Sequence, residues 1–159
     1  MTKAAGKSFF SRYKEAILFN RNLIISGAGA FFASAYVSQL YAQYDSNDFA
    51  NSTLALAVEY GVYIPVFAML YYVDNRNKYV DPATGRSNSR RVREDIKKLF
   101  AAFSVSEVIY SITKVVMQYA LLQTASQPYE ASMASSLVAW GVFFVAINLM
   151  AKIVKLFRR

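Results

Sequence analysis

The chain contains no cysteine and no histidine among its 159 residues. The absence of cysteine excludes disulfides, thiol catalysis and thiolate metal sites. The absence of histidine removes the commonest transition-metal ligand and the commonest general base near neutral pH. No paired-carboxylate or nucleophile motif replaces them, so we expect a protein that is not an enzyme and that uses no metal or cofactor.

Proline and glycine are also scarce, with three and six residues, whereas 55% of the chain is hydrophobic. A transmembrane helix needs about 20 mainly apolar residues to cross a hydrocarbon core of about 30 Å. Four stretches meet this requirement, at about 22–42, 53–73, 99–122 and 132–151. The sequence therefore predicts an all-α integral membrane protein with four transmembrane helices in one membrane domain, 1–159.

The basic residues alternate with the apolar stretches. All Lys and Arg residues except Lys114 lie before the first stretch, in the loop 74–98, or in the tail that starts at Lys152. Positively charged loops stay on the cytoplasmic side, so both termini and the loop 74–98 are predicted to be cytoplasmic in a multi-pass plasma-membrane protein. The net charge of +8 then indicates contact with anionic lipid headgroups rather than nucleic acid.

The segment 8–21 precedes the first apolar stretch and has an apolar stripe at helical spacing. The stripe consists of Phe9, Phe10, Tyr13, Ala16 and Ile17, and the basic side chains lie away from it. Two interpretations fit the pattern equally. One is an amphipathic helix resting on the inner headgroups, and the other is an N-terminal extension of the first transmembrane helix.

The two halves of the chain resemble each other. The segment that begins at Val58 and reads Val-Glu-Tyr-Gly-Val-Tyr is matched 80 residues later by Val-Ala-Trp-Gly-Val-Phe, which begins at Val138. Each half would form a helical hairpin with the same orientation. The pattern favours two hairpins related as a parallel internal repeat.

Three ionisable residues fall inside the predicted spans. A charge at the bilayer centre costs about 2.5–3.5 kcal/mol on insertion scales, so these residues should face the bundle interior and find partners. Helix direction places Glu59 and Lys114 at similar depth, which predicts that they pair. The pair either specifies helix packing or belongs to a polar path on which Lys114 accepts a phosphate or carboxylate. The polar residues of this path are Glu59, Glu107, Ser111, Lys114, Gln118 and Asn148.

The last helix ends in the pattern Asn148-Leu-Met-Ala-Lys152-Ile-Val-Lys-Leu-Phe157, and Gly27 lies inside the first apolar stretch. Together with the four-helix layout, this resembles the GtrA-like family of small membrane proteins. The resemblance implies translocation of polyprenyl-phosphate-linked sugars, or assistance to it. The basic residues expected to attract the lipid headgroup are Arg21, Lys97, Lys98 and Lys152.

Two other functions remain open from the sequence. The chain could be a non-catalytic accessory subunit that stabilises a larger membrane complex, such as a membrane oxidase or monooxygenase, or it could form a homodimer. The other open function is a proton- or cation-coupled exporter of small molecules. That function requires Glu59 or Glu107 to face a shared cavity.

Overall fold

The computed structural model describes residues 9–81, 85–124 and 126–157. Within these ranges the protein consists of four long helices and one short 3-10 helix. All four long helices are long and apolar enough to cross a membrane, which confirms the all-helical, multi-span prediction. The elements are α1 (Phe9–Tyr41), α2 (Asp48–Asn75), η1 (Arg76–Lys78), α3 (Ser89–Gln123) and α4 (Pro128–Ile153).

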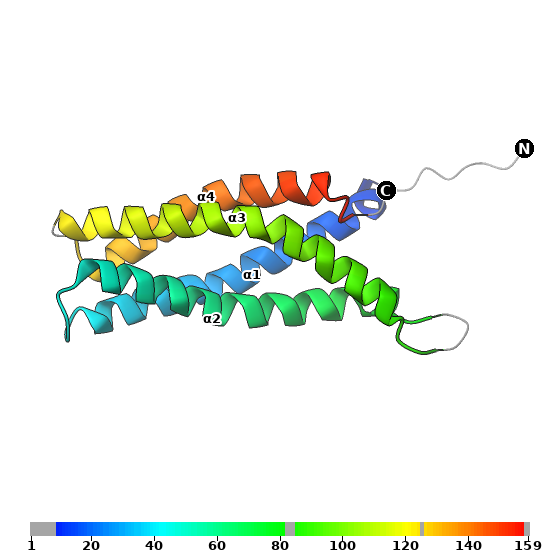
Figure 1. Cartoon of the computed structure of the whole chain (residues 1–159), viewed down its shortest axis with the longest axis horizontal. Coiled ribbons are helices and arrows are strands. Elements are labelled where there is room, and N and C mark those ends of the chain that lie inside the picture. The colour runs from blue at the N-terminus through cyan, green and yellow to red at the C-terminus, as the bar shows by residue number, and fades with distance from the viewer. Residues whose placement is uncertain (1–8, 82–84, 125, 158–159) are drawn as a thin grey trace, which may run out of the picture.

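The helices lie lengthwise beside one another in a bundle (Figure 1). The short connections from α1 to α2 and from α3 to α4 lie at one end. The start of α1, the end of α4 and the connection from α2 to α3 lie at the other end, called here the loop end. α1 packs most extensively against α2, and α3 against α4, while contacts of α1 with α4 and of α2 with α3 close the bundle.

The buried side chains recur at every fourth position. Rows of this spacing form ridges that pack into the grooves of a neighbouring helix. Small residues dominate the row of α1, and small residues let helix backbones approach closely in lipid. The rows are Ser26, Ala30, Ser34 and Ser38 in α1; Asn51, Ala55, Glu59, Tyr63 and Phe67 in α2; Ala102, Ser106, Tyr110, Lys114 and Gln118 in α3; and Ala131, Ser135, Ala139, Phe143 and Ile147 in α4.

All four helices begin before the predicted apolar stretches, α1 and α3 by the largest margins. α1 starts at Phe9 and continues without a break, so the segment expected on the headgroups forms, within the described residues, the first turns of α1; Ser8 lies outside them. α3 starts at Ser89 and has 35 residues. At 1.5 Å per residue it measures about 50 Å, which exceeds the hydrocarbon core. Its first turns therefore extend beyond the apolar part of the bundle.

The loop end is ordered by local hydrogen bonds. The Asn88 side chain accepts a bond from the Arg91 N–H and caps α3. Gly85 has φ of +65°, a conformation that glycine adopts without strain, and its N–H donates to the Asp81 carbonyl at 2.8 Å. The Tyr79 hydroxyl donates to the Asp95 carboxylate at 3.2 Å and so ties the connection to α3.

A cluster of aromatic rings fills the bundle between its centre and the loop end. The Phe19 and Phe67 ring centroids are 5.7 Å apart, and those of Phe67 and Phe103 are 5.1 Å apart. Phe143 joins from α4 at 6.1 Å from Phe103. Edge-to-face and tilted contacts of this kind add to the stabilisation from apolar burial. The polar centre described next therefore lies beside an apolar layer.

Candidate functional site

Glu59 and Lys114 form the ion pair that the sequence predicts. The Lys114 Nζ lies 3.1 Å from the Glu59 Oε1. Lys114 is 0% exposed and Glu59 is 3% exposed, so both charges are removed from solvent. Removing two charges from water costs several kcal/mol per ion, which their attraction offsets only when further hydrogen bonds satisfy them. The surroundings of each group therefore determine what the pair can do.

Helix α4 supplies the other partners of Lys114. The Nζ donates to the Ser132 carbonyl at 2.8 Å, to the Ser132 Oγ at 3.1 Å and to the Ser136 Oγ at 2.5 Å. A lysine ammonium has three donors, and four protein oxygens surround this one. In this conformation, Lys114 therefore has no donor left for a phosphate or carboxylate ligand.

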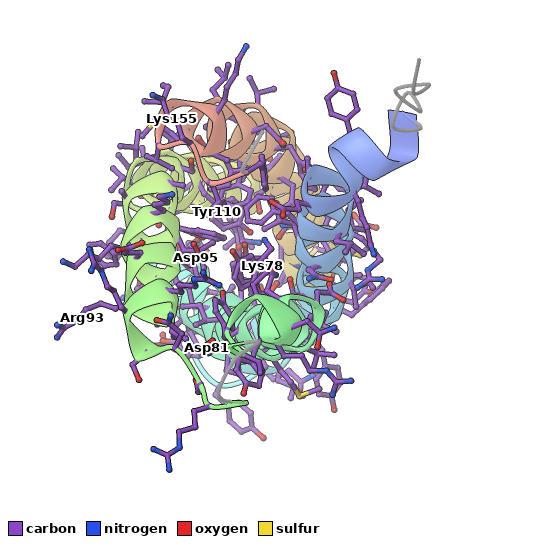
Figure 2. All side chains as sticks on the ribbon, turned by 90° about the vertical axis from the view of Figure 1, so that its right-hand side faces the viewer. Lys78, Asp81, Arg93, Asp95, Tyr110 and Lys155 are labelled. Carbon is purple, nitrogen blue, oxygen red and sulfur yellow. The ribbon has the colours of Figure 1, made fainter. Side chains whose placement is uncertain are left out.

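Glu59 accepts bonds from three helices. Its Oε1 accepts from the Ser34 hydroxyl of α1 at 2.7 Å and from the Ser136 hydroxyl of α4 at 2.5 Å. Its Oε2 accepts from the Tyr110 hydroxyl of α3. Figure 2 shows Tyr110 in the middle of the bundle, between the helices. The ion pair and its hydrogen bonds thus join all four helices at one point.

A small cavity lies against this network. About 20 Å³ is available to the centre of a water molecule, which is room for about one water. Glu59 and Glu107 both line the cavity, together with the aromatic side chains of Tyr60, Tyr63 and Trp140. The carboxylate residues Glu59 and Glu107 therefore line one small, half-open space.

Two tyrosines shape the polar side of the cavity. The Tyr60 hydroxyl shares a hydrogen bond with the Ser111 hydroxyl at 2.6 Å, which links α2 to α3 beside Glu107. Tyr63 is 8% exposed, and its hydroxyl has no hydrogen-bond partner among the described residues. Glu107 likewise forms no ion pair with any residue that the structure describes. The cavity thus contains an unbalanced carboxylate and an unused hydroxyl.

The predicted polar stripe of α3 divides into two parts. Lys114 and Gln118 are fully buried, whereas Glu107 and Ser111 are half-buried. The Gln118 Nε2 donates to the Ser38 Oγ at 3.1 Å, in a separate cluster with Asn51 near the short connections. The structure therefore brings together Glu59, Glu107 and Lys114 but places Gln118 in another group.

Asn148 lies apart from the cavity and pairs with α1. Its Nδ2 donates to the Asn20 Oδ1 at 2.9 Å, and the Asn20 Nδ2 donates back at 3.0 Å. This reciprocal amide pair joins α1 to α4. Its evident effect is to hold the two helices in register.

The four basic residues predicted to attract headgroups differ in their surroundings. Arg21 pairs with Asp74 at 2.7 Å, and Lys98 donates to the Lys155 carbonyl at 3.3 Å. Lys97 and Lys152 are exposed. Two of the four residues thus bond to the protein itself, and two present their side chains to the surroundings.

The serines that bond to Lys114 and Glu59 were not among the site residues predicted from the sequence. Ser132 and Ser136 are four residues apart on α4 and face Lys114, and Ser34 faces Glu59 from α1. The four-residue spacing of Ser132 and Ser136 places them on one face of α4, and this spacing is visible in the sequence. No sequence pattern distinguishes Tyr63, because aromatic residues are frequent throughout the chain.

The fold and this centre define a multi-span helical membrane protein with a buried ion pair and an acidic, aromatic cavity at its core. The comparisons with known proteins add no family to this description. No family model, no curated protein and no solved structure matches the chain.

Proposed function

We propose that the protein is a small transporter that couples the movement of a small molecule to that of a proton or another cation. One observation carries this proposal: Glu59 and Glu107 line the same cavity at the centre of the bundle. Ionisable residues at this depth are costly, and they commonly mark substrate or ion pathways. A shared cavity is the arrangement that coupled transport requires.

The charges of the cavity support the same proposal. Lys114 balances Glu59 at 3.1 Å, whereas Glu107 forms no ion pair among the described residues. When Glu107 is ionised, the site therefore carries one negative charge without a balancing partner. A proton or a monovalent cation would neutralise it, so a small cationic molecule that exchanges with a proton at this site would have its movement coupled to that of the proton.

The two halves of the bundle would supply the necessary motion. We take α1 with α2 and α3 with α4 as two hairpins related by a parallel repeat. Buried positions support this, because Ser26, Ser34 and Ser38 of α1 correspond at an offset of 80 residues to the buried Ser106, Lys114 and Gln118 of α3. The cavity is lined by both halves, so rocking of one against the other would open it.

The basic residues support an orientation for this transporter. They gather at the loop end, which would face the cytoplasm of a plasma membrane, with α1 beginning at the inner headgroups. Figure 2 shows Arg93 pointing away from the bundle at this end, as a side chain near lipid phosphates would.

The test is proton movement in liposomes that contain the purified protein and a luminal pH dye. Outward potassium gradients with valinomycin would impose a membrane potential in the presence of sodium, choline, guanidinium or methylammonium. We expect at least one cation to give protein-dependent proton movement. Glu107→Gln should abolish this movement, whereas Glu94→Gln, an exposed control on α3 that pairs with Arg90, should retain it. Absence of proton movement with every cation in the folded wild type would contradict the proposal.

A second candidate is the accessory subunit, and the saturated surroundings of Lys114 favour it. An ion pair whose donors are all satisfied, beside a cavity for about one water, also suits a rigid scaffold. Gentle detergent extraction followed by native mass spectrometry distinguishes the two. Larger subunits in fixed ratio would support the accessory role, and a lone monomer or homodimer would support the transporter.

The same spectrum addresses translocation of polyprenyl-phosphate-linked sugars. The exposed Lys97 and Lys152 support attraction of a lipid phosphate to the loop end. Passage near Lys114 would require its ammonium to exchange serine and glutamate oxygens for phosphate oxygens. Copurification of polyprenyl phosphate, lost in Lys97→Gln/Lys152→Gln, would favour this function over cation coupling.

A further inference from the structure

We infer that the cavity binds a water-sized monovalent cation that carries N–H groups, of the ammonium or methylammonium class, between Glu107, Tyr60 and Tyr63. This inference rests on the proposed function and names the class of ion that its central site takes. Four properties of the cavity support it: its size, its charge, its unused hydrogen-bonding group and its aromatic walls.

Size limits the occupant first. The space available to the centre of a water molecule is about 20 Å³, which admits about one water. An ammonium ion is close to water in size, and methylammonium adds a single methyl group. Larger organic cations such as tetramethylammonium would require the helices to separate. The conformation described here therefore selects a small ion.

Charge sets the valence of the occupant. The Glu59 carboxylate already has Lys114 at 3.1 Å, and it accepts three further hydrogen bonds from Ser34, Ser136 and Tyr110. Glu107 adds a second carboxylate to the cavity wall and has no ion pair in the described part of the chain. One monovalent cation neutralises the site. A divalent ion would need about six oxygen ligands. The ion-pair network already uses the oxygens of Glu59, Tyr110 and Ser136, which leaves four on Glu107, Tyr60 and Tyr63.

Hydrogen bonding distinguishes N–H cations from metal ions. The Tyr63 hydroxyl is buried at the cavity wall without a partner among the described residues, and an unsatisfied buried hydroxyl costs about 1–3 kcal/mol. Its oxygen can accept an N–H bond. Tyr60 places a second hydroxyl oxygen nearby, held at 2.6 Å from the Ser111 Oγ. An ammonium ion has four N–H donors, enough for both hydroxyl oxygens and the Glu107 carboxylate.

The aromatic walls favour the same class. The rings of Tyr110, Trp140 and Phe143 line the cavity, and ring faces attract cations by about 0.5–2 kcal/mol depending on desolvation. A site lined by several aromatic side chains and few free oxygens suits ammonium better than sodium. Sodium loses more hydration when it enters such a site.

Equilibrium binding tests the inference. Isothermal titration calorimetry would measure ammonium, methylammonium, sodium and tetramethylammonium chlorides against the full chain in nanodiscs of phosphatidylcholine and phosphatidylglycerol. We expect one saturable site for ammonium and methylammonium and none for tetramethylammonium. Glu107→Gln should weaken ammonium binding at least about tenfold, and Tyr63→Phe should weaken it several-fold. The matched controls are Glu94→Gln and Tyr36→Phe, both exposed on the bundle surface.

Each result has a definite meaning. Equal binding of sodium and ammonium, or unchanged binding in Glu107→Gln, would overturn the assignment, as would no binding by wild type that keeps its helical circular dichroism. Ammonium binding without proton movement in liposomes would sustain this inference and contradict the transport proposal. Proton movement driven by another cation, without ammonium binding, would support the transport proposal and overturn the assignment of an ammonium site.

Discussion

At the scale of single residues, Lys114 shows how a charge can be kept inside an apolar bundle. Its ammonium contacts one carboxylate, one carbonyl and two hydroxyls. Each contact alone would be insufficient against the cost of burial, but together they satisfy the group. The stability of the protein should therefore depend strongly on keeping both members of the pair.

The first prediction concerns this pair. Lys114→Met or Glu59→Gln alone should lower the free energy of unfolding by about 3–5 kcal/mol, because each leaves a buried partner uncompensated. The double variant should lose less than the sum of the single losses. Circular dichroism during titration with sodium dodecyl sulfate would measure unfolding. Additive losses would show that the two charges are not coupled. If a single variant does not accumulate, recovery of folded protein in the double variant is the readout.

The second prediction concerns a close contact between α1 and α4. A methyl group added at Gly27 would overlap the ring of Trp140, whereas one added at Gly61 meets open space. Gly27→Ala should therefore destabilise the protein by about 1–3 kcal/mol, the usual cost of overpacking. Gly61→Ala is the matched control and should leave the melting temperature unchanged or slightly raised. Equal melting temperatures for the two variants would contradict the contact.

At the scale of elements, the connection between α2 and α3 is joined to the helix that follows it. The Tyr79 hydroxyl donates to Asp95, and Val80 forms an isolated bridge with Ser87. Burial of Tyr79 and the nearby negative charge of Asp95 raise the pKa of the Tyr79 hydroxyl from 10.0 to about 12. The link is therefore sensitive to alkaline pH.

The third prediction follows from the sign of this shift. A raised pKa means that the folded state holds the proton more tightly than the unfolded state does. The stabilisation is therefore complete below pH 10 and is lost as the pH rises toward about 12. Tyrosinate absorbance of wild type minus Tyr79→Phe should show a late-titrating group. Asp95→Asn should move that titration to lower pH, and an unchanged titration would contradict the role of Asp95.

The elements also show what sequence can and cannot predict. The four spans follow from apolar length alone, and the Glu59–Lys114 pair follows from depth, because a buried charge needs an opposite charge at its own level. All four helices start before the predicted apolar stretches, α1 and α3 by the most, because polar residues can continue a helix beyond its apolar stretch and hydropathy does not mark where the helix ends. The contacts of the serines around Lys114, and the absence of a partner for the Tyr63 hydroxyl among the described residues, depend on how each helix is rotated about its axis, which hydropathy alone does not specify.

At the scale of the whole molecule, the bundle has two unlike ends. Short connections without Lys or Arg lie at one end, and the basic loop and the helix ends next to both termini lie at the other. The polar centre lies between them, beside the aromatic layer. A protein of this form should insert in one direction only, because moving many basic residues across a membrane is unfavourable.

The fourth prediction tests this direction. Since the chain has no cysteine, single cysteines give an unambiguous label. In intact cells, Ser46→Cys in the connection from α1 to α2 should react with an impermeant maleimide. Ser87→Cys, in the connection from α2 to α3, should react only after permeabilisation; both positions are exposed. The reverse pattern would invert the proposed topology and place the basic residues outside.

The contact of Trp140 with Gly27 has a practical consequence. Trp140 is the only tryptophan of the chain, and it lies both on the wall of the cavity and against α1. Its emission wavelength reports the polarity around the indole, so the protein contains an intrinsic optical reporter at its centre. Entry of an ion, admission of water or separation of α1 from α4 would each change this signal. The opening of the bundle can therefore be followed in real time without attaching a dye.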